Sequence, residues 1–166
     1  KKNEAKPVNI NGKARFFNVA RFSPVAKGQH LLLEAFASEK WRDRDWQVSF
    51  IGVSGFGKTY LEKMATFFGL ADDRIRIIEH TENVLDEMIN HDVLLMPSMA
   101  EGTPFAMIES MAAGRPALGT PVGGIGELLI DNKTGWFCRS VDVKDISDKL
   151  EEVWQQRSEW TRLGKN

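Results

Sequence analysis

The sequence contains a single cysteine, Cys138, and has almost no excess of charge of either sign. One cysteine excludes a disulfide within the chain and a cysteine-based metal cluster, and it favours a reducing compartment such as the cytoplasm. The 22 Lys and Arg residues and the 23 Asp and Glu residues give a formal net charge of -1. This balance does not support a general nucleic-acid binder, because such proteins usually carry a basic excess. We therefore expect a cytoplasmic protein with no nucleic-acid partner and no bound metal.

Long apolar stretches are also missing. No run approaches the roughly 20 apolar residues that a membrane-spanning helix needs, and residues 1–7 lack the apolar core of a signal peptide. The chain starts without methionine, so we expect its start to be a cut boundary within a longer protein. The remaining composition, with 42% hydrophobic and 27% charged residues among 166, is ordinary for one globular domain with a real core.

Short apolar segments alternate with helix-like segments along the chain. We expect six strands, at residues 15–20, 46–51, 74–79, 92–97, 115–119 and 136–138. Helices are expected at residues 29–37, 59–68, 84–89, 103–113 and 125–129, followed by a long amphipathic helix capped by Asp142. This alternation predicts an α/β fold, a Rossmann-like doubly wound parallel six-stranded sheet with right-handed crossovers.

The predicted domain covers residues 15–157. Residues 1–14 are expected to form a lead-in or interdomain linker, and residues 158–166 a C-terminal tail. Within that tail Trp160 and Leu163 are the apolar residues, and we expect them to be available to cover another domain.

The expected strand order 3-2-1-4-5-6 reverses between strands one and four. Ligands of doubly wound sheets bind at such a switch point, beyond the carboxyl ends of the strands. The loops at this point are residues 21–28 and 98–103, which makes Arg21, Lys27 and Glu101 expected neighbours.

Residues 101–109 (EGTPFAMIE) place two carboxylates around a predicted helix start. Thr103 is a candidate N-cap and Pro104 suits the first helical position. Glu101 then lies in the loop, and Glu109 lies about two turns along a helix with apolar neighbours, where a carboxylate is costly unless it is satisfied. Because a helix N-terminus attracts anions, this arrangement suits a sugar attached to a diphosphate.

Several motifs occur in the order typical of one enzyme family. Residues 19–30 (VARFSPVAKGQH) carry an Arg…Lys-Gly signature, residues 101–109 carry two glutamates separated by seven residues, and residues 112–117, 119–124 and 131–137 continue the match. On these motifs the chain resembles the family-four retaining glycosyltransferases over nearly its whole length. The resemblance implies the GT-B fold, of which this chain would be the C-terminal half, the nucleotide-sugar donor domain.

The resemblance also implies roles for individual residues. Arg21, Lys27 and Glu101 would form the catalytic group, in which the two cations clamp the diphosphate and Glu101 binds hydroxyls of the transferred sugar or orders the phosphate loop. Glu109 would accept hydrogen bonds from the ribose hydroxyls. Residues that would hold the donor through close backbone approach or backbone contacts are Gly102, Thr103, Pro104 and Phe105 near the sugar and β-phosphate, and Glu79, His80 and Thr81 near the base. The family spacing from Arg to Lys is commonly one residue shorter than that from Arg21 to Lys27, which leaves the pose of Lys27 open.

The implied reaction is transfer of a hexose-type sugar, with retention and usually without a metal, from a UDP- or GDP-linked donor. The acceptor, a sugar, a lipid or another molecule, would be held by a missing N-terminal domain, which could also associate peripherally with a membrane. No residue of the chain is a convincing covalent nucleophile, and we expect this fragment alone to bind donor weakly and to transfer nothing.

Residues 52–59 (GVSGFGKT) support a competing hypothesis, because they fit the P-loop pattern of nucleotide hydrolases between a strand and a helix. A P-loop enzyme also needs an aspartate at the end of a second apolar strand, and the fourth strand ends in Met96 and Pro97. A non-catalytic nucleotide-sugar-binding module and an epimerase of GT-B architecture remain further alternatives. Outside a donor site, His80 and His91 are expected to be surface histidines.

Overall fold

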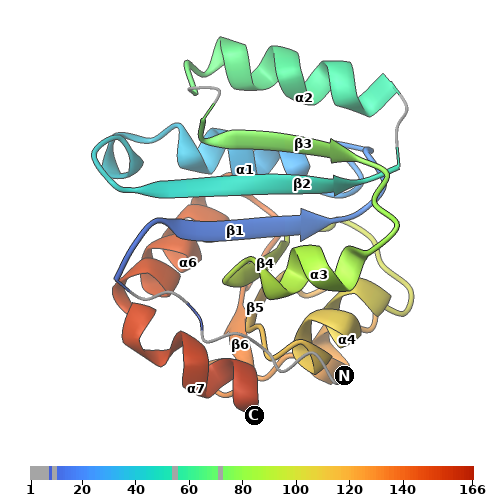
Figure 1. Cartoon of the computed structure of the whole chain (residues 1–166), viewed down its shortest axis with the longest axis vertical. Coiled ribbons are helices and arrows are strands. Elements are labelled where there is room, and N and C mark those ends of the chain that lie inside the picture. Colours follow the sequence, from blue (N-terminus) through green and yellow to red (C-terminus); the bar gives the residue numbers. More distant parts are fainter. Residues whose placement is uncertain (1–7, 9–10, 54–55, 71–72) are drawn as a thin grey trace.

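A single parallel sheet runs through the protein, which we describe from a computed structural model covering residues 8, 11–53, 56–70 and 73–166. The strands lie in the order β3-β2-β1-β4-β5-β6, and each adjacent pair is parallel (Figure 1). Their bounds are Ala14–Val19 (β1), Trp46–Gly52 (β2), Ile75–Glu79 (β3), Val93–Met96 (β4), Ala117–Gly119 (β5) and Gly135–Phe137 (β6). The predicted doubly wound α/β fold and its strand order are confirmed.

Helices cover both faces of the sheet. They are α1 (Gln29–Phe36), α2 (Phe56–Phe67), α3 (Val84–Ile89), α4 (Phe105–Ala112), α5 (Ile125–Leu128), α6 (Val143–Gln155) and α7 (Trp160–Lys165), with 3₁₀ turns η1 (Glu39–Trp41) and η2 (Arg157–Glu159). Adjacent residues of β1 show the two layers: Phe16 packs with α1, α2, α6 and α7, whereas Phe17 packs with α3, α4 and α5. Both phenylalanines are fully buried, as expected for a strand covered on both sides.

The helix after β4 begins later than the sequence predicts. In the structure α4 starts at Phe105, and the preceding Pro104 makes no side-chain cap. The carbonyl oxygen of Thr103 accepts a hydrogen bond from the Phe105 N–H at 3.0 Å, which turns the chain before the helix. The prediction that Thr103 is the N-cap is therefore wrong, although the helix ends just before Gly114 as expected.

The end of the chain belongs to the core of this domain. Trp160 and Leu163 are buried, and the Trp160 indole N–H donates to the carbonyl oxygen of Val153 at 2.9 Å. The Trp160 ring also meets Phe16 with ring centroids 5.8 Å apart. The expectation that Trp160 and Leu163 cover another domain is therefore wrong, because α7 closes its own sheet. The proposed lead-in falls largely outside the described residues.

The position of His91 also differs from the prediction. Its side chain is 3% exposed, with Nδ1 2.6 Å from the carbonyl oxygen of Glu87 and Nε2 2.8 Å from Ser49 Oγ. Burial lowers the pKa of His91. The expectation of a surface histidine is wrong here, whereas His80 is exposed. None of the helices in the described part of the chain has the length and apolar content that crossing a membrane requires.

Candidate functional site

The loops that follow β1 and β4 lie side by side at the switch point of the sheet. Lys27 Nζ donates to Glu101 Oε1 at 2.7 Å, and the Met99 N–H donates to the carbonyl oxygen of Ala26 at 3.0 Å. The structure therefore brings together the loops at residues 21–28 and 98–103.

A cavity of about 390 Å³ opens between these loops and the start of α4. Six of the residues predicted for the site line it: Arg21, Lys27, Glu101, Thr103, Pro104 and Phe105. The other lining residues are Val19, Ala20, Met96 and Ala106. Because α4 begins at Phe105 beside this space, the positive end of a helix and two cations border the same cavity.

A second cavity, of about 230 Å³, adjoins the first. The two share Val19, Ala20 and Arg21, so Arg21 stands at their boundary. The remaining lining residues come from the end of β2 and the residue after it, the turn after β3 and the start of α3: Ile51, Gly52, Val53, His80, Thr81 and Val84. Together the cavities extend across the carboxyl edge of the sheet, from α4 to the turn after β3.

The two cations of the first cavity differ in their surroundings. Lys27 and Glu101 form a sheltered pair, with side chains 19% and 10% exposed, and Ser98 Oγ also donates to Glu101 Oε1 at 2.6 Å. Arg21 is exposed, and its guanidinium has no hydrogen-bond or ion-pair partner among the residues that the structure describes. The charge of Lys27 is therefore balanced within the protein, whereas the charge of Arg21 remains available to an anion.

Close backbone contacts fix the loops around the first cavity. A Cβ on Gly28 would lie 1.8 Å from the carbonyl oxygen of Pro97, and a Cβ on Gly123 would lie 1.8 Å from that of Glu101. Gly123 also has a φ of 51°, which a side chain disfavours. Gly102 is different, because a Cβ there would meet nothing within 4 Å. The fold therefore requires Gly28 and Gly123 but leaves the space beside Gly102 open.

Glu109 stands outside both cavities. It is exposed on α4, four residues after Phe105, which is itself 69% exposed. Ile108 on the same helix is exposed as well. The sequence predicts an apolar setting that would make this carboxylate costly, but this face of α4 is open, so Glu109 remains in contact with water.

The three residues predicted to lie near a base, at the end of β3 and in the turn after it, have different surroundings. His80 and Thr81 line the second cavity, whereas the carboxylate of Glu79 accepts a hydrogen bond from Lys58 Nζ at 2.5 Å. His80 has a φ of 53°, an uncommon conformation for a residue with a side chain. Its N–H donates to the carbonyl oxygen of Gly52 at 2.9 Å.

The same ion pair bears on the P-loop hypothesis. In that hypothesis Lys58 would bind nucleotide phosphates, but here Nζ is engaged by Glu79 and lies 3.9 Å from Glu62 Oε1. Ser54 and Gly55, which would belong to the phosphate-binding loop, lie outside the described residues. The occupied lysine disfavours nucleotide hydrolysis at this segment.

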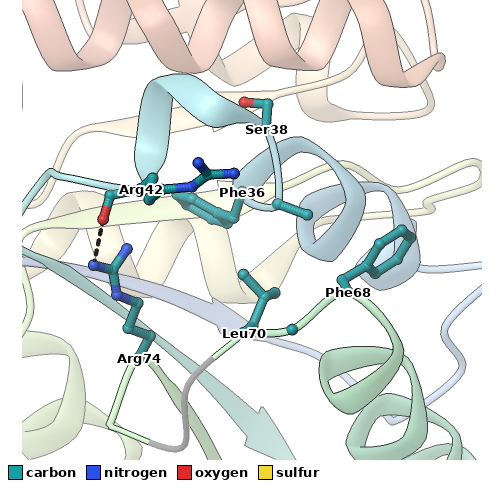
Figure 2. Close-up of a pocket in the computed structure, with 8 residues that line it drawn as sticks. Phe36, Ser38, Arg42, Phe68, Leu70 and Arg74 are labelled. Atoms are coloured by element: carbon teal, nitrogen blue, oxygen red, sulfur yellow. Dashed lines mark hydrogen bonds between the residues drawn. The ribbon is translucent and has the colours of Figure 1, made fainter.

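A third cavity, of about 280 Å³, lies at the opposite edge of the sheet. Figure 2 shows Arg74, just before β3, donating to the carbonyl oxygen of Arg42 at 2.7 Å. The remaining lining residues follow or end α1 and α2: Phe36, Ala37, Ser38, Phe68, Gly69 and Leu70. None of the predicted site residues lines it. Within the described ranges, no group of three or more His, Cys, Asp or Glu side chains could hold a metal ion.

Comparison with known proteins gives a consistent family. The family model described as "Glycosyl transferases group 1" matches residues 1–166. An uncharacterized glycosyltransferase of Methanocaldococcus jannaschii is 28% identical over 150 residues, which cover 89% of this chain and 40% of that protein. The chain therefore spans less than half the length of this curated relative.

Solved structures show the same fold. The Anabaena protein HepE, determined in complex with UDP and glucose, superposes with a TM-score of 0.82 at 20% identity, over 95% of this chain and 43% of its own. The C-terminal domain of a glycosyl transferase group 1 family protein, LpcC from Francisella tularensis, superposes with a TM-score of 0.77 at 20% identity, over 100% of this chain and 89% of that one. The sheet is thus the Rossmann-like fold of GT-B carboxy-terminal domains, and the chain belongs to the glycosyl transferases group 1 family.

Proposed function

We propose that this chain is the donor-binding domain of a retaining glycosyltransferase and that its two adjoining cavities hold one nucleoside-diphosphate sugar. The observation that carries the proposal is the position of Arg21, a cation with no partner among the described residues, which stands at the boundary of both cavities and beside the start of α4. A diphosphate is the part of such a donor that lies between nucleoside and sugar, so it would lie at this boundary.

Arg21 and the N-terminus of α4 would then bind the diphosphate. Guanidinium groups bind phosphate oxygens through paired hydrogen bonds, and helix N-termini add backbone donors. As the sugar leaves, negative charge grows on the diphosphate, and fixed donors at that position stabilise the transition state. The sheltered Lys27, which also lines the first cavity, would contribute its charge while it stays paired with Glu101.

Glu101 would recognise the transferred sugar. Its Oε1 accepts hydrogen bonds from both Lys27 and Ser98, and its Oε2 accepts none among the described residues. A carboxylate held by two partners on one oxygen can present the other to a sugar hydroxyl. The open space beside Gly102 would accommodate the donor close to the backbone, with Thr103, Pro104 and Phe105 bordering the sugar and β-phosphate.

The nucleoside would occupy the second cavity. His80 and Thr81 line it, and Glu109, on the exposed face of α4, would accept hydrogen bonds from the ribose hydroxyls. A UDP-linked hexose is the donor that we favour, because the similar HepE structure contains UDP and glucose. A GDP-linked sugar is the second candidate.

The acceptor belongs to another part of the enzyme in this proposal. The matched relative is more than twice as long as the aligned region, which leaves room for an acceptor domain facing the carboxyl edge. We propose a cytoplasmic enzyme that takes its acceptor, a sugar or a lipid, from that domain and needs no metal. This chain alone would bind donor without transferring its sugar.

Calorimetric titration with UDP, GDP and ADP tests the proposal. We expect one of them, UDP first, to bind this chain at millimolar concentration or below, and EDTA to leave the affinity unchanged. Arg21→Ala should weaken binding about tenfold to a hundredfold, the loss of hydrogen bonds to a charged group. The matched control is Arg42→Ala, which removes an equal charge at the third cavity. Absence of binding by all three nucleotides would refute the donor-domain assignment.

A further inference from the structure

Residues 52–59, which fit the P-loop pattern, contribute Gly52 and Val53 to the lining of the second cavity, but the donor site proposed above gives Lys58 no role. The structure describes all of them except residues 54 and 55. Lys58 lies in the first turn of α2 and reaches the end of β3, where Nζ meets Glu79 Oε2 at 2.5 Å. The hydrogen bond to Glu79 raises the pKa of Lys58, so its charge persists at neutral pH.

This pair is attached to a strained turn. Glu79 is the last residue of β3, and His80 follows with a φ of 53°. A residue with a side chain keeps that conformation only where neighbouring groups impose it. Two groups of the 52–59 segment make contact here: the carbonyl oxygen of Gly52 accepts from the His80 N–H, and Lys58 holds the preceding Glu79.

The same segment also contacts the chain on both sides of Arg21. A Cβ on Gly52 would lie 1.9 Å from the carbonyl oxygen of Ala20, and a Cβ on Gly57 would lie 2.0 Å from that of Phe22. The glycines of the P-loop pattern therefore allow close packing against the loop that carries Arg21. The segment thus connects the two walls of the second cavity, Arg21 on one side and His80 on the other.

We infer that Lys58 is a positioning residue for nucleotide recognition, which holds Glu79 and thereby fixes the His80 turn that forms one wall of the nucleoside cavity. This inference rests on the proposed function. In this inference Glu79 supports the His80 turn and does not itself contact the donor. Lys58 also balances the charge of Glu79, which would otherwise act on a doubly charged donor a short distance away.

The test is Lys58→Met in this chain, measured by calorimetry with UDP and by the amide NMR signals of His80 and Thr81. We expect both amide signals to shift and UDP affinity to fall about fivefold, while the melting temperature hardly changes, because a partly exposed ion pair contributes little to stability. Lys58→Arg, which restores a donor to Glu79, should recover most of the affinity.

Two controls separate positioning from loss of charge. Glu62→Gln removes the second partner of Lys58 but leaves the pair with Glu79, and Lys144→Met breaks a more exposed pair with Asp148 on α6. Neither should change the His80 signal or UDP affinity.

Two outcomes would overturn the inference. One is that the His80 and Thr81 signals stay unchanged in Lys58→Met, and the other is that Lys58→Met and Lys144→Met change UDP affinity by the same factor. If the unmodified chain binds no nucleotide while the signals still shift, the proposed function fails and the support of the turn stands.

Discussion

The two edges of the sheet use their polar side chains in opposite ways. At the amino edge, Arg115 is 1% exposed and donates to the carbonyl oxygens of Met88 and Ile89 at 3.3 and 2.6 Å, which caps the end of α3. At the carboxyl edge, Arg21 is exposed and has no partner among the described residues. Two arginines of one chain thus serve folding and, in our proposal, binding.

Other residues follow the same division. At the amino edge His91 is bonded on both ring nitrogens, and the carboxylate of Asp92 accepts from the Arg15 N–H at 2.7 Å. At the carboxyl edge Glu109 and His80 are exposed. These buried polar groups of the amino edge are satisfied by hydrogen bonds within the fold, which avoids a desolvation penalty. Exposed polar groups gathered at the switch point are those that a ligand can use.

Replacement of Arg115 should give the largest effect on stability. Arg115→Met removes the donors that satisfy the last carbonyl groups of α3, and we expect a loss of about 3 kcal/mol in the free energy of unfolding. Urea denaturation measures it. The control, Arg139→Met, removes an exposed arginine and should change the value by less than about 0.5 kcal/mol. Similar losses in the two variants would remove the distinction between the edges.

Two glycines test whether the carboxyl edge is rigid despite its free side chains. Gly123→Ala places a Cβ against the carbonyl oxygen of Glu101 at a positive φ, so we expect a loss of about 2 kcal/mol. Gly102→Ala meets open space and should change stability by less than about 0.5 kcal/mol, while it weakens UDP binding by filling the space proposed for the donor. Thermal unfolding and calorimetry separate the two. If Gly102→Ala proves the more destabilising, this view of the loops is wrong.

The pH dependence of stability should show the smallest effect. Because the pKa of His91 is lowered in the folded state, the unfolded chain binds a proton that the folded chain does not. The contribution of His91 to the free energy of unfolding is fully present above pH 6.5, the ordinary pKa of histidine. It is lost as the pH drops from there to the pKa of the folded state, by at most about 1.4 kcal/mol per pH unit. Denaturation of the protein and of His91→Gln between pH 5 and 7 measures it. An identical pH slope in both would show that folding does not lower the pKa of His91.

The sheet and the location of the candidate site were predictable because they follow from chain order. Six alternations of strand and helix leave few topologies for a parallel sheet, and the switch point then places residues 21–28 beside residues 98–103. The 2.7 Å hydrogen bond between Lys27 and Glu101 confirms that these two loops are neighbours.

Features that depend on distant partners were not predictable. His91 is polar and follows a helix, and its burial depends on Ser49, 42 residues away in sequence, as well as on the nearby Glu87 carbonyl oxygen. Trp160 follows a polar stretch, and its place in the core depends on Phe16 and Val153. The exposure of Glu109 depends on which face of α4 meets the sheet, and Met107 and Ser110 occupy that face. Sequence spacing alone gives none of these contacts.

The way the carboxyl-edge loops are held has a consequence for how the family diversifies. Main-chain groups make several of their contacts: Gly28 against Pro97, Gly123 against Glu101, and the Gly124 N–H donating to the carbonyl oxygen of Gly102 at 3.1 Å. A loop whose shape depends on its backbone can exchange side chains without losing that shape. In the donor site that we propose, new substrate preferences can therefore arise by single substitutions that hardly change stability, whereas the same number of changes at Arg115 or His91 would be selected against as folding defects.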